Sequence, residues 1–259
     1  MTDLRSGVSE NRTKPALLVV SAHAGDFVWR AGGAIAAATM RGERAVIACL
    51  SYGERGESAS QWLQGKPLDE IKKIRRDEAE AAAAELGADI EFLDLGDYPL
   101  LESPEAVERL VDVYRRAQPT VVLTHPLLDP YNGDHPAAAR MAIQARILAQ
   151  AIGVAVDGEY PSLDDIIGAP PLFFFEPHQP EQSDFKPNLL LDITDAFPLK
   201  RKAMECLPAQ KHMWDYYTSL AIRRGVQVKR NAGPNLGLTH ETMGEAYMRY
   251  YPEVTTVLA

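Results

Sequence analysis

The sequence contains few cysteines and no long hydrophobic run. Its only cysteines, Cys49 and Cys206, are too few for a disulfide framework and suit a reducing compartment. No apolar run approaches the roughly 18 residues that a membrane-spanning helix requires. The first fifteen residues are polar and lack the apolar centre of a secretory signal. We therefore expect a cytoplasmic protein with no membrane partner, whose N-terminus (residues 1–14) is frayed.

Positive charge is also scarce in this chain. The 27 Lys and Arg residues are outnumbered by 36 Asp and Glu residues, which leaves a formal net charge of -9. Nonspecific binding to a phosphate backbone needs a net basic face, so nucleic acid is not expected as a partner. The composition, 46% apolar and 24% charged, is that of an ordinary globular protein.

Short apolar runs alternate with longer helical stretches, most clearly over the first 152 residues. This alternation predicts an α/β fold in which helices cover both faces of a mostly parallel sheet. The predicted strands are residues 16–22, 45–51, 90–95, 121–125, 172–175 and 189–193. The predicted helices are residues 29–41, 68–86, 104–117, 135–152 and 200–224.

The second half of the chain has weaker periodicity, because prolines interrupt it between residues 155 and 187. Its few apolar runs are too short to form a separate core. We therefore predict that residues 1–259 form a single domain, in which residues 155–259 complete the site and pack on the core.

Polar residues follow several of the predicted strands. Ligands of open parallel sheets bind beyond the carboxyl ends of the strands, so these residues are the candidate site. His23 and Asp26 follow the first strand and His135 begins the fourth predicted helix; two histidines and one carboxylate suit Zn²⁺ with an open position. The alternative is that His23 and Asp26 only cap a helix and that His135 is exposed. The spacing alone leaves both interpretations open.

Several motifs resemble those of the PIG-L/LmbE-like zinc deacetylase superfamily, over essentially residues 16–224. They are the His-x-x-Asp turn before Gly32-Gly33, the Gly53-Glu54-x-Gly56 loop, the acidic and basic helix at residues 75–80, and Asp134-His135. The resemblance implies a Rossmann-like fold and one Zn²⁺ ion per chain, bound through His23, Asp26 and His135.

Two departures from the deacetylase pattern bear on the reaction. Gly25 stands where those enzymes have the aspartate that activates the zinc-bound water, and Asn132 stands where they commonly have an oxyanion-stabilising histidine. Loss of a general base costs a hydrolase about 10²–10⁴-fold in rate, which disfavours amide cleavage. Residues 23–33, 51–58 and 175–181 instead resemble a hydratase branch of the superfamily, the 4-oxalomesaconate hydratases of gallate degradation. This implies a hydro-lyase that adds water to the C=C bond of 4-oxalomesaconate, giving 4-carboxy-4-hydroxy-2-oxoadipate.

Hydration requires a group that activates water and a group that protonates carbon. Glu54, on the glycine-flanked loop, is the candidate replacement for the missing base, and His178 is the candidate proton donor. Glu54 has the alternative of capping the helix near residue 68 or pairing with Arg55 in solvent. For His178, which lies between prolines, the alternative is a rigid surface turn.

A polycarboxylate substrate needs cationic and polar partners, for which Arg30, Arg55, Tyr131 and Asn132 are the candidates. His125 and Asp134 are expected to orient the metal ligands. The basic residues of the helix at 68–86, namely Lys72, Lys73, Arg75 and Arg76, are expected on its solvated face.

Two other functions stay open. One is a zinc-dependent N-deacetylase of an amino sugar or related small molecule; the other is a non-catalytic anion- or sugar-binding module on the same scaffold. A homo-oligomer is also expected, from the apolar strand at residues 172–175 and from loops that could reach a neighbouring chain.

Overall fold

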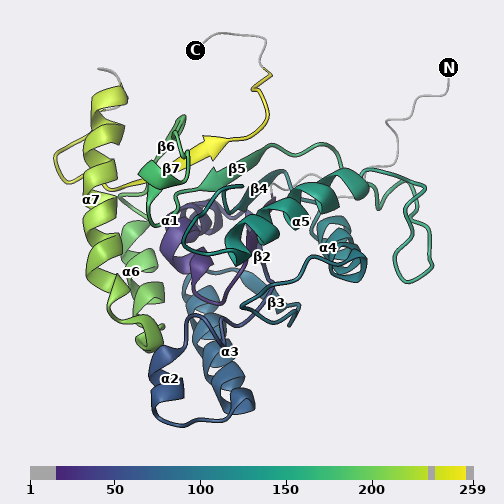
Figure 1. Cartoon of the computed structure of the whole chain (residues 1–259). Coiled ribbons are helices and arrows are strands. Elements are labelled where there is room, and N and C mark those ends of the chain that lie inside the picture. Colours follow the sequence, from purple (N-terminus) through teal and green to yellow (C-terminus); the bar gives the residue numbers. More distant parts are fainter. Residues whose placement is uncertain (1–15, 233–236, 255–259) are drawn as a thin grey trace.

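The strands of the chain form one mixed sheet. The structure, a computed structural model, describes residues 16–232 and 237–254; the predicted frayed segment, residues 1–14, lies outside them. Within the described residues the sheet has seven strands in the order β3-β2-β1-β4-β5-β7-β6 (Figure 1). They are β1 (Ala16–Ser21), β2 (Arg44–Cys49), β3 (Asp89–Phe92), β4 (Val121–Thr124), β5 (Leu172–Phe175), β6 (Leu189–Asp192) and β7 (Gly244–Arg249). Neighbours from β3 to β5 run parallel, and β7 is antiparallel to β5 and β6. The predicted mostly parallel α/β fold is therefore confirmed.

Helices cover both faces of this sheet. They are α1 (Asp26–Met40), α2 (Ala59–Leu63), α3 (Leu68–Glu85), α4 (Pro104–Ala117), α5 (Asp134–Leu148), α6 (Phe197–Glu205) and α7 (Met213–Asn231). Helices α1, α3, α6 and α7 lie on one side of the sheet and α4 and α5 on the other (Figure 1). The apolar residues of each group form a separate core cluster. Along β1, Leu17 and Val19 join the first cluster while Leu18 and Val20 join the second. Because both faces of β1 are buried, its sequence is a continuous apolar run.

The C-terminal part of the chain departs from the sequence prediction in two places. The helical stretch expected at 200–224 is two helices, α6 and α7, because Pro208 and the short 3-10 turn Pro208–Gln210 interrupt it. Strand β7 was not predicted, since its sequence GEAYMR contains no apolar run. It is buried because it inserts between β5 and β6.

A buried carboxylate ties β7 to the first helix. Glu245 accepts hydrogen bonds from the backbone N–H groups of Gly33 and Ala34, at 2.8 and 2.9 Å, and pairs with Lys200 Nζ of α6 at 2.7 Å. The residues after 155 thus share the sheet and the core of the first half.

One of the two reasons for expecting a homo-oligomer, the apolar strand at residues 172–175, does not hold in this fold. All four residues of Leu172–Phe175 are buried inside the sheet, so this strand offers no surface to another chain.

None of the described helices combines the length and the apolar character needed to cross a bilayer.

Candidate active site

The loop between β1 and α1 brings two predicted metal ligands together. His23 follows the end of β1 and is fully buried, and Asp26 is the first residue of α1. Asp26 Oδ2 accepts a hydrogen bond from the backbone N–H of His23 at 2.9 Å and lies 3.1 Å from His23 Nδ1. The tight turn therefore holds the imidazole against the carboxylate.

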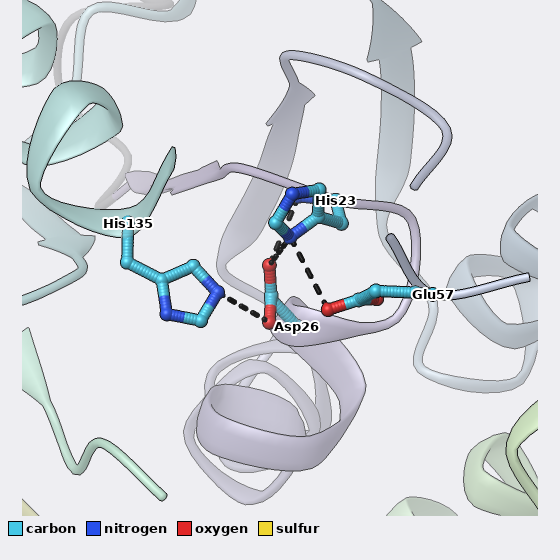
Figure 2. Close-up of side chains that lie close together, drawn as sticks. All are labelled: His23, Asp26, Glu57 and His135. Atoms are coloured by element: carbon cyan, nitrogen blue, oxygen red, sulfur yellow. Dashed lines mark hydrogen bonds and ion pairs between the residues drawn. The ribbon is translucent and has the colours of Figure 1, made fainter. Parts of the chain in front are cut away.

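The third predicted ligand, His135, reaches the same point from α5. Its Nδ1 lies 2.8 Å from Asp129 Oδ2, and its Nε2 lies 3.5 Å from Asp26 Oδ1 (Figure 2). Because the Asp129 carboxylate can only accept, Nδ1 is the donor in this contact, and it leaves Nε2 facing Asp26. Within the described part of the chain, this buried Nε2 has no hydrogen-bond partner.

Glu57 completes the cluster, although the sequence analysis gave it no role. Glu57 Oε1 lies 3.3 Å from His23 Nδ1 (Figure 2). One ligand atom each from His23, Asp26, Glu57 and His135 lie within 4.8 Å of one another. The glycine at position 53 is the feature of the sequence that could have indicated this approach. Gly53 has φ +67, and a Cβ there would lie 3.2 Å from the Cβ atoms of both His23 and Glu57. The glycine allows the loop to approach the first strand this closely.

Both residues predicted to orient the ligands contact them. Asp134 Oδ2 lies 3.0 Å from His23 Nε2, and the same carboxylate accepts N–H groups of Tyr98 and Leu100 at 3.0 and 2.9 Å. His125 accepts the N–H of Ala22 on its Nε2 at 3.0 Å, and its ring stacks on that of His135 with centroids 4.1 Å apart. These contacts restrict the rotation of both imidazoles.

The electrostatics of the cluster favour a bound cation. Burial would lower the pKa of His23, but Glu57, Asp134 and Asp26 raise it well above its ordinary value. Burial would likewise raise the pKa of Asp26, but the neighbouring histidines, chiefly His135, hold it well below its usual range. The carboxylates therefore stay ionised around a point that attracts positive charge.

The residues present fit a divalent metal ion. Two imidazoles and one or two carboxylates are the ligands of catalytic zinc sites with an open position, and they also accept other divalent metals. The buried Nε2 of His135, which has no hydrogen-bond partner among the described residues, is an independent indication, because a buried polar atom without a partner costs about 1–3 kcal/mol.

Glu54, the predicted base, lies outside this cluster. Its buried carboxylate accepts the N–H of Tyr52 on Oε2 at 3.2 Å, while Oε1 lies 3.4 Å from Arg55 Nη1 and 3.8 Å from Lys72 Nζ. Burial, together with the charge of Asp97, raises the pKa of Glu54. Through these contacts Glu54 stabilises the loop between β2 and α2. A catalytic role for Glu54 stays a prediction.

His178 and Arg30 lie on the β5 side of the cluster. Arg30 is buried, with Nε 3.4 Å from Asp26 Oδ1 and Nη1 donating to the Glu176 carbonyl at 3.2 Å. His178 is half-buried and stacks on Tyr216 with ring centroids 4.3 Å apart. Burial and then the charge of Arg30 lower the pKa of His178. The predicted cation, Arg30, is therefore close enough to lower the pKa of the predicted proton donor, His178.

The other predicted substrate contacts have local partners. Arg55 lies 3.7 Å from Asp97 Oδ1 through its Nη1 as well as near Glu54. The exposed Tyr131 bonds Gln182 through its hydroxyl at 2.5 Å, and Asn132 Oδ1 accepts the N–H of Asp134 at 3.0 Å at the start of α5. Their roles toward a substrate stay predictions.

The solvated face expected for the basic residues of α3 is wrong for one of them. Arg75 is fully buried; its Nη2 donates to Gln210 Oε1 at 2.8 Å and its Nη1 pairs with Glu78 Oε2 at 2.5 Å. The charge is tolerated because each side of the guanidinium has a partner. Lys73, in contrast, is exposed and pairs with Asp77 as expected for helical spacing.

Comparison with known proteins gives matches over most of the chain. Residues 18–146 match the family described as GlcNAc-PI de-N-acetylase, PIG-L. The chain is 48% identical to the 4-oxalmesaconate hydratase of Pseudomonas putida strain KT2440 over 256 residues, 98% of this chain and 96% of that protein.

Solved structures match as well. The crystal structure of 4-carboxy-2-hydroxymuconate hydratase from Pseudomonas putida KT2440 superposes with a TM-score of 0.88 at 48% identity, over 95% of this chain and 100% of that one. The N,N'-diacetylchitobiose deacetylase of Pyrococcus horikoshii has a TM-score of 0.73 at 24% identity, over 92% and 85% of the two chains. The latter likeness shows a shared fold.

Proposed function

The chain belongs to the PIG-L family, as its motifs indicated, and from this premise we propose that it is a hydratase of 4-oxalomesaconate in gallate-type aromatic degradation. The observation that carries the proposal is 48% identity to a 4-oxalmesaconate hydratase along 98% of the chain. The reaction adds H and OH across a C=C bond and gives 4-carboxy-4-hydroxy-2-oxoadipate.

The substrates named for the two hydratases are chemically equivalent. 4-Oxalomesaconate and 4-carboxy-2-hydroxymuconate are the keto and enol tautomers of one tricarboxylate. A site for either must accommodate three negative charges and bring water to a carbon of the alkene. Arg30, buried beside Asp26, is the cation best placed for one substrate carboxylate.

We propose that Zn²⁺ is held by His23, Asp26 and His135, whose geometry and unpartnered Nε2 support this assignment. A bound zinc ion would lower the pKa of a coordinated water to about 7 or polarise a substrate oxygen. Asp134 and Asp129 hold the two imidazoles so that Nδ1 of His23 and Nε2 of His135 face the same point.

Glu57 is better suited than Glu54 to accept the proton of the attacking water. Its carboxylate belongs to the metal-ligand cluster, and, although burial opposes ionisation, the charge of His23 lowers its pKa. Glu54 has no atom in this cluster and instead faces Arg55 and Lys72, so it is not placed to take that proton. We therefore assign the water proton to Glu57.

His178 is proposed to deliver the second proton to carbon. The hydroxide equivalent from water bonds to one alkene carbon, and a proton donated by an N–H group of His178 bonds to the other. Glu57 then returns the water proton to solvent and His178 takes one up, which balances the reaction. The stack on Tyr216 fixes the plane of the imidazole for this transfer.

We further propose that the enzyme works in the cytoplasm as a homo-oligomer. Free Cys49 and Cys206 support a reducing compartment. Exposed Leu101 and Leu128 offer apolar surface to a second chain.

The function is tested directly with the purified chain. We expect it to consume 4-oxalomesaconate, followed by loss of ultraviolet absorbance, with a kcat on the order of 1–10³ s⁻¹ and with the hydrated product identified by mass spectrometry. Acetate release from N-acetylated amino sugars should be absent. Deacetylation in place of hydration would refute the proposal.

Replacing His178 with alanine should lower kcat by about 10²–10⁴-fold, because the carbon then takes its proton from water. Metal content should be unchanged, since His178 is not among the proposed ligands. The control is His240→Ala, which removes an exposed histidine that contacts Lys229 and should behave like the parent. Mixing His23→Ala and His178→Ala chains should restore activity only if His178 serves a neighbouring chain's site. A parental kcat for His178→Ala would remove this residue from the mechanism.

A further inference from the structure

Gln210 lies beside the cluster, on the short turn between α6 and α7, and has no role in the function proposed above. We propose that Gln210 is a positioning residue, whose side-chain amide directs the Glu57 carboxylate toward the metal-ligand cluster and occupies the space that a side chain at position 25 would need. The proposal rests on the proposed function, in which Glu57 accepts the proton of water.

The orientation of the Gln210 amide is determined by its partners. Its Oε1 accepts hydrogen bonds from Arg75 Nη2 at 2.8 Å and from Trp29 Nε1 at 3.3 Å, and both of these groups can only donate. The amide nitrogen is thereby turned to Glu57, and Nε2 donates to Glu57 Oε2 at 3.3 Å. The other oxygen of that carboxylate, Oε1, is the one 3.3 Å from His23 Nδ1. Gln210 thus holds one oxygen of Glu57 while the other faces the cluster.

The glycine at position 25 is explained by the same amide. Gly25 has φ -102 and ψ -25, a conformation open to any residue, so backbone freedom is not what requires glycine. A Cβ at Gly25 would lie 2.4 Å from Gln210 Oε1 and 2.7 Å from Trp29 Nε1. Both contacts are far shorter than atoms allow, so the Gln210 amide and any larger residue at position 25 exclude each other.

The turn that carries Gln210 is itself anchored to α3. Glu78 accepts the N–H of Ala209 on Oε1 at 3.0 Å, and its Oε2 pairs with Arg75, which in turn donates to Gln210. Gln210 is 6% exposed and Arg75 is fully buried. The buried Arg75–Glu78 ion pair therefore binds both the backbone of the turn and the side chain of Gln210. The Gln210 amide consequently has little freedom to move away from Glu57.

The sharpest test is Gln210→Glu, which keeps the length of the side chain and an oxygen for Arg75 and Trp29. It replaces the donor that faces Glu57 with a second carboxylate oxygen. We expect kcat to fall about 10–100-fold, as for other residues that orient a catalytic side chain through a hydrogen bond. KM should stay within about threefold of the parent value. Bound metal should stay near one per chain, and the thermal midpoint within about 4 °C. If Gln210→Glu folds poorly, Gln210→Met, which is uncharged and of the same length, serves as the test instead. It should also lower kcat.

The controls separate positioning from stability. Gln144→Glu places the same charge change on the exposed face of α5 and should leave kcat at the parental value. Gly25→Ala should lower kcat as the Gln210 variants do, and the double variant Gly25→Ala/Gln210→Glu should be no slower than the slower single variant, because both changes act on Glu57.

A readout without turnover completes the test. In a crystal structure of Gln210→Met, the distance from His23 Nδ1 to Glu57 Oε1 should exceed the 3.3 Å found here. Parental kcat in both Gln210 variants, or a lower thermal midpoint at unchanged kcat per bound metal, would overturn the positioning role. Failure of the parent itself to hydrate 4-oxalomesaconate would instead refute the proposed function, and the crystal structure would still decide whether Gln210 positions Glu57.

Discussion

Alanine at His23 or at His135 should abolish metal binding and lower hydration activity by about 10³-fold or more. Each histidine supplies one of the few ligand atoms of the cluster, and the remaining carboxylates cannot complete a site of the same geometry. A catalytic metal contributes several kcal/mol of transition-state stabilisation, which corresponds to at least about 10³ in rate. Elemental analysis of the purified variants gives the metal content, and kcat is measured on the same samples.

The matched control is His240→Ala, which removes an exposed histidine that contacts Lys229 far along the chain from the cluster. It should keep one metal per chain and the parental rate. Full metal occupancy in both His23→Ala and His135→Ala would show that the cluster is not the metal site.

Glutamine at Glu57 should lower kcat by about 10²–10⁴-fold while the metal content stays near that of the parent. The amide has the shape of the carboxylate but cannot accept the proton of water, so the loss falls on the chemical step. Rates at saturating 4-oxalomesaconate and metal content, measured on the same preparations, test this. Loss of metal from Glu57→Gln would mean that Glu57 is a ligand rather than the base.

Glu54→Gln is the informative comparison, because the two glutamates lie on one loop and only Glu57 belongs to the cluster. Glu54 holds Tyr52 and faces Arg55 and Lys72, so its replacement should affect thermal stability more than kcat. If Glu54→Gln loses 10²-fold or more in kcat, by about the general-base magnitude, and Glu57→Gln does not, the base assigned from sequence is correct and the one assigned here is wrong.

The loop between β2 and α2 illustrates why the sequence pointed to Glu54 and gave no role to Glu57, which the structure places in the cluster. Both Glu54 and Glu57 follow a strand end and flank Gly56, and nothing in the local pattern ranks them. The path of the loop, which brings Glu57 and not Glu54 to the His23 cluster, is held by Asp97, which accepts the N–H groups of Arg55 at 3.0 Å and Gly56 at 2.7 Å from a loop about forty residues away. That contact is long-range, so it has no signature in the loop itself.

The local sequence pattern was sufficient to predict the strands and helices whose apolar residues repeat regularly along the chain. The apolar runs of β1 and β2 and the helical period between them predicted a parallel sheet, because a strand buried on both faces must be apolar throughout. The His-x-x-Asp spacing predicted that His23 and Asp26 can point to one centre, since the two residues lie three apart on a tight turn between a strand and a helix. Strand β7 had no such signal, because its pairing between β5 and β6, and not its composition, makes it a strand.

The sequence by itself determined the α/β fold, because its apolar runs repeat along the chain, and its motifs indicated the family and, through that resemblance, the grouping of His23, Asp26 and His135 at the edge where parallel strands end. Only the tertiary structure decided that Glu57 joins them, that Arg75 is buried, and that Gln210 occupies the space beside Gly25. Gln210 and Gly25 are separated by most of the chain, and their contact depends on how α6 and α7 pack against α1 and α3. Steric exclusion between residues so far apart in the sequence arises from the packing of the core, so no single stretch of the sequence predicts it.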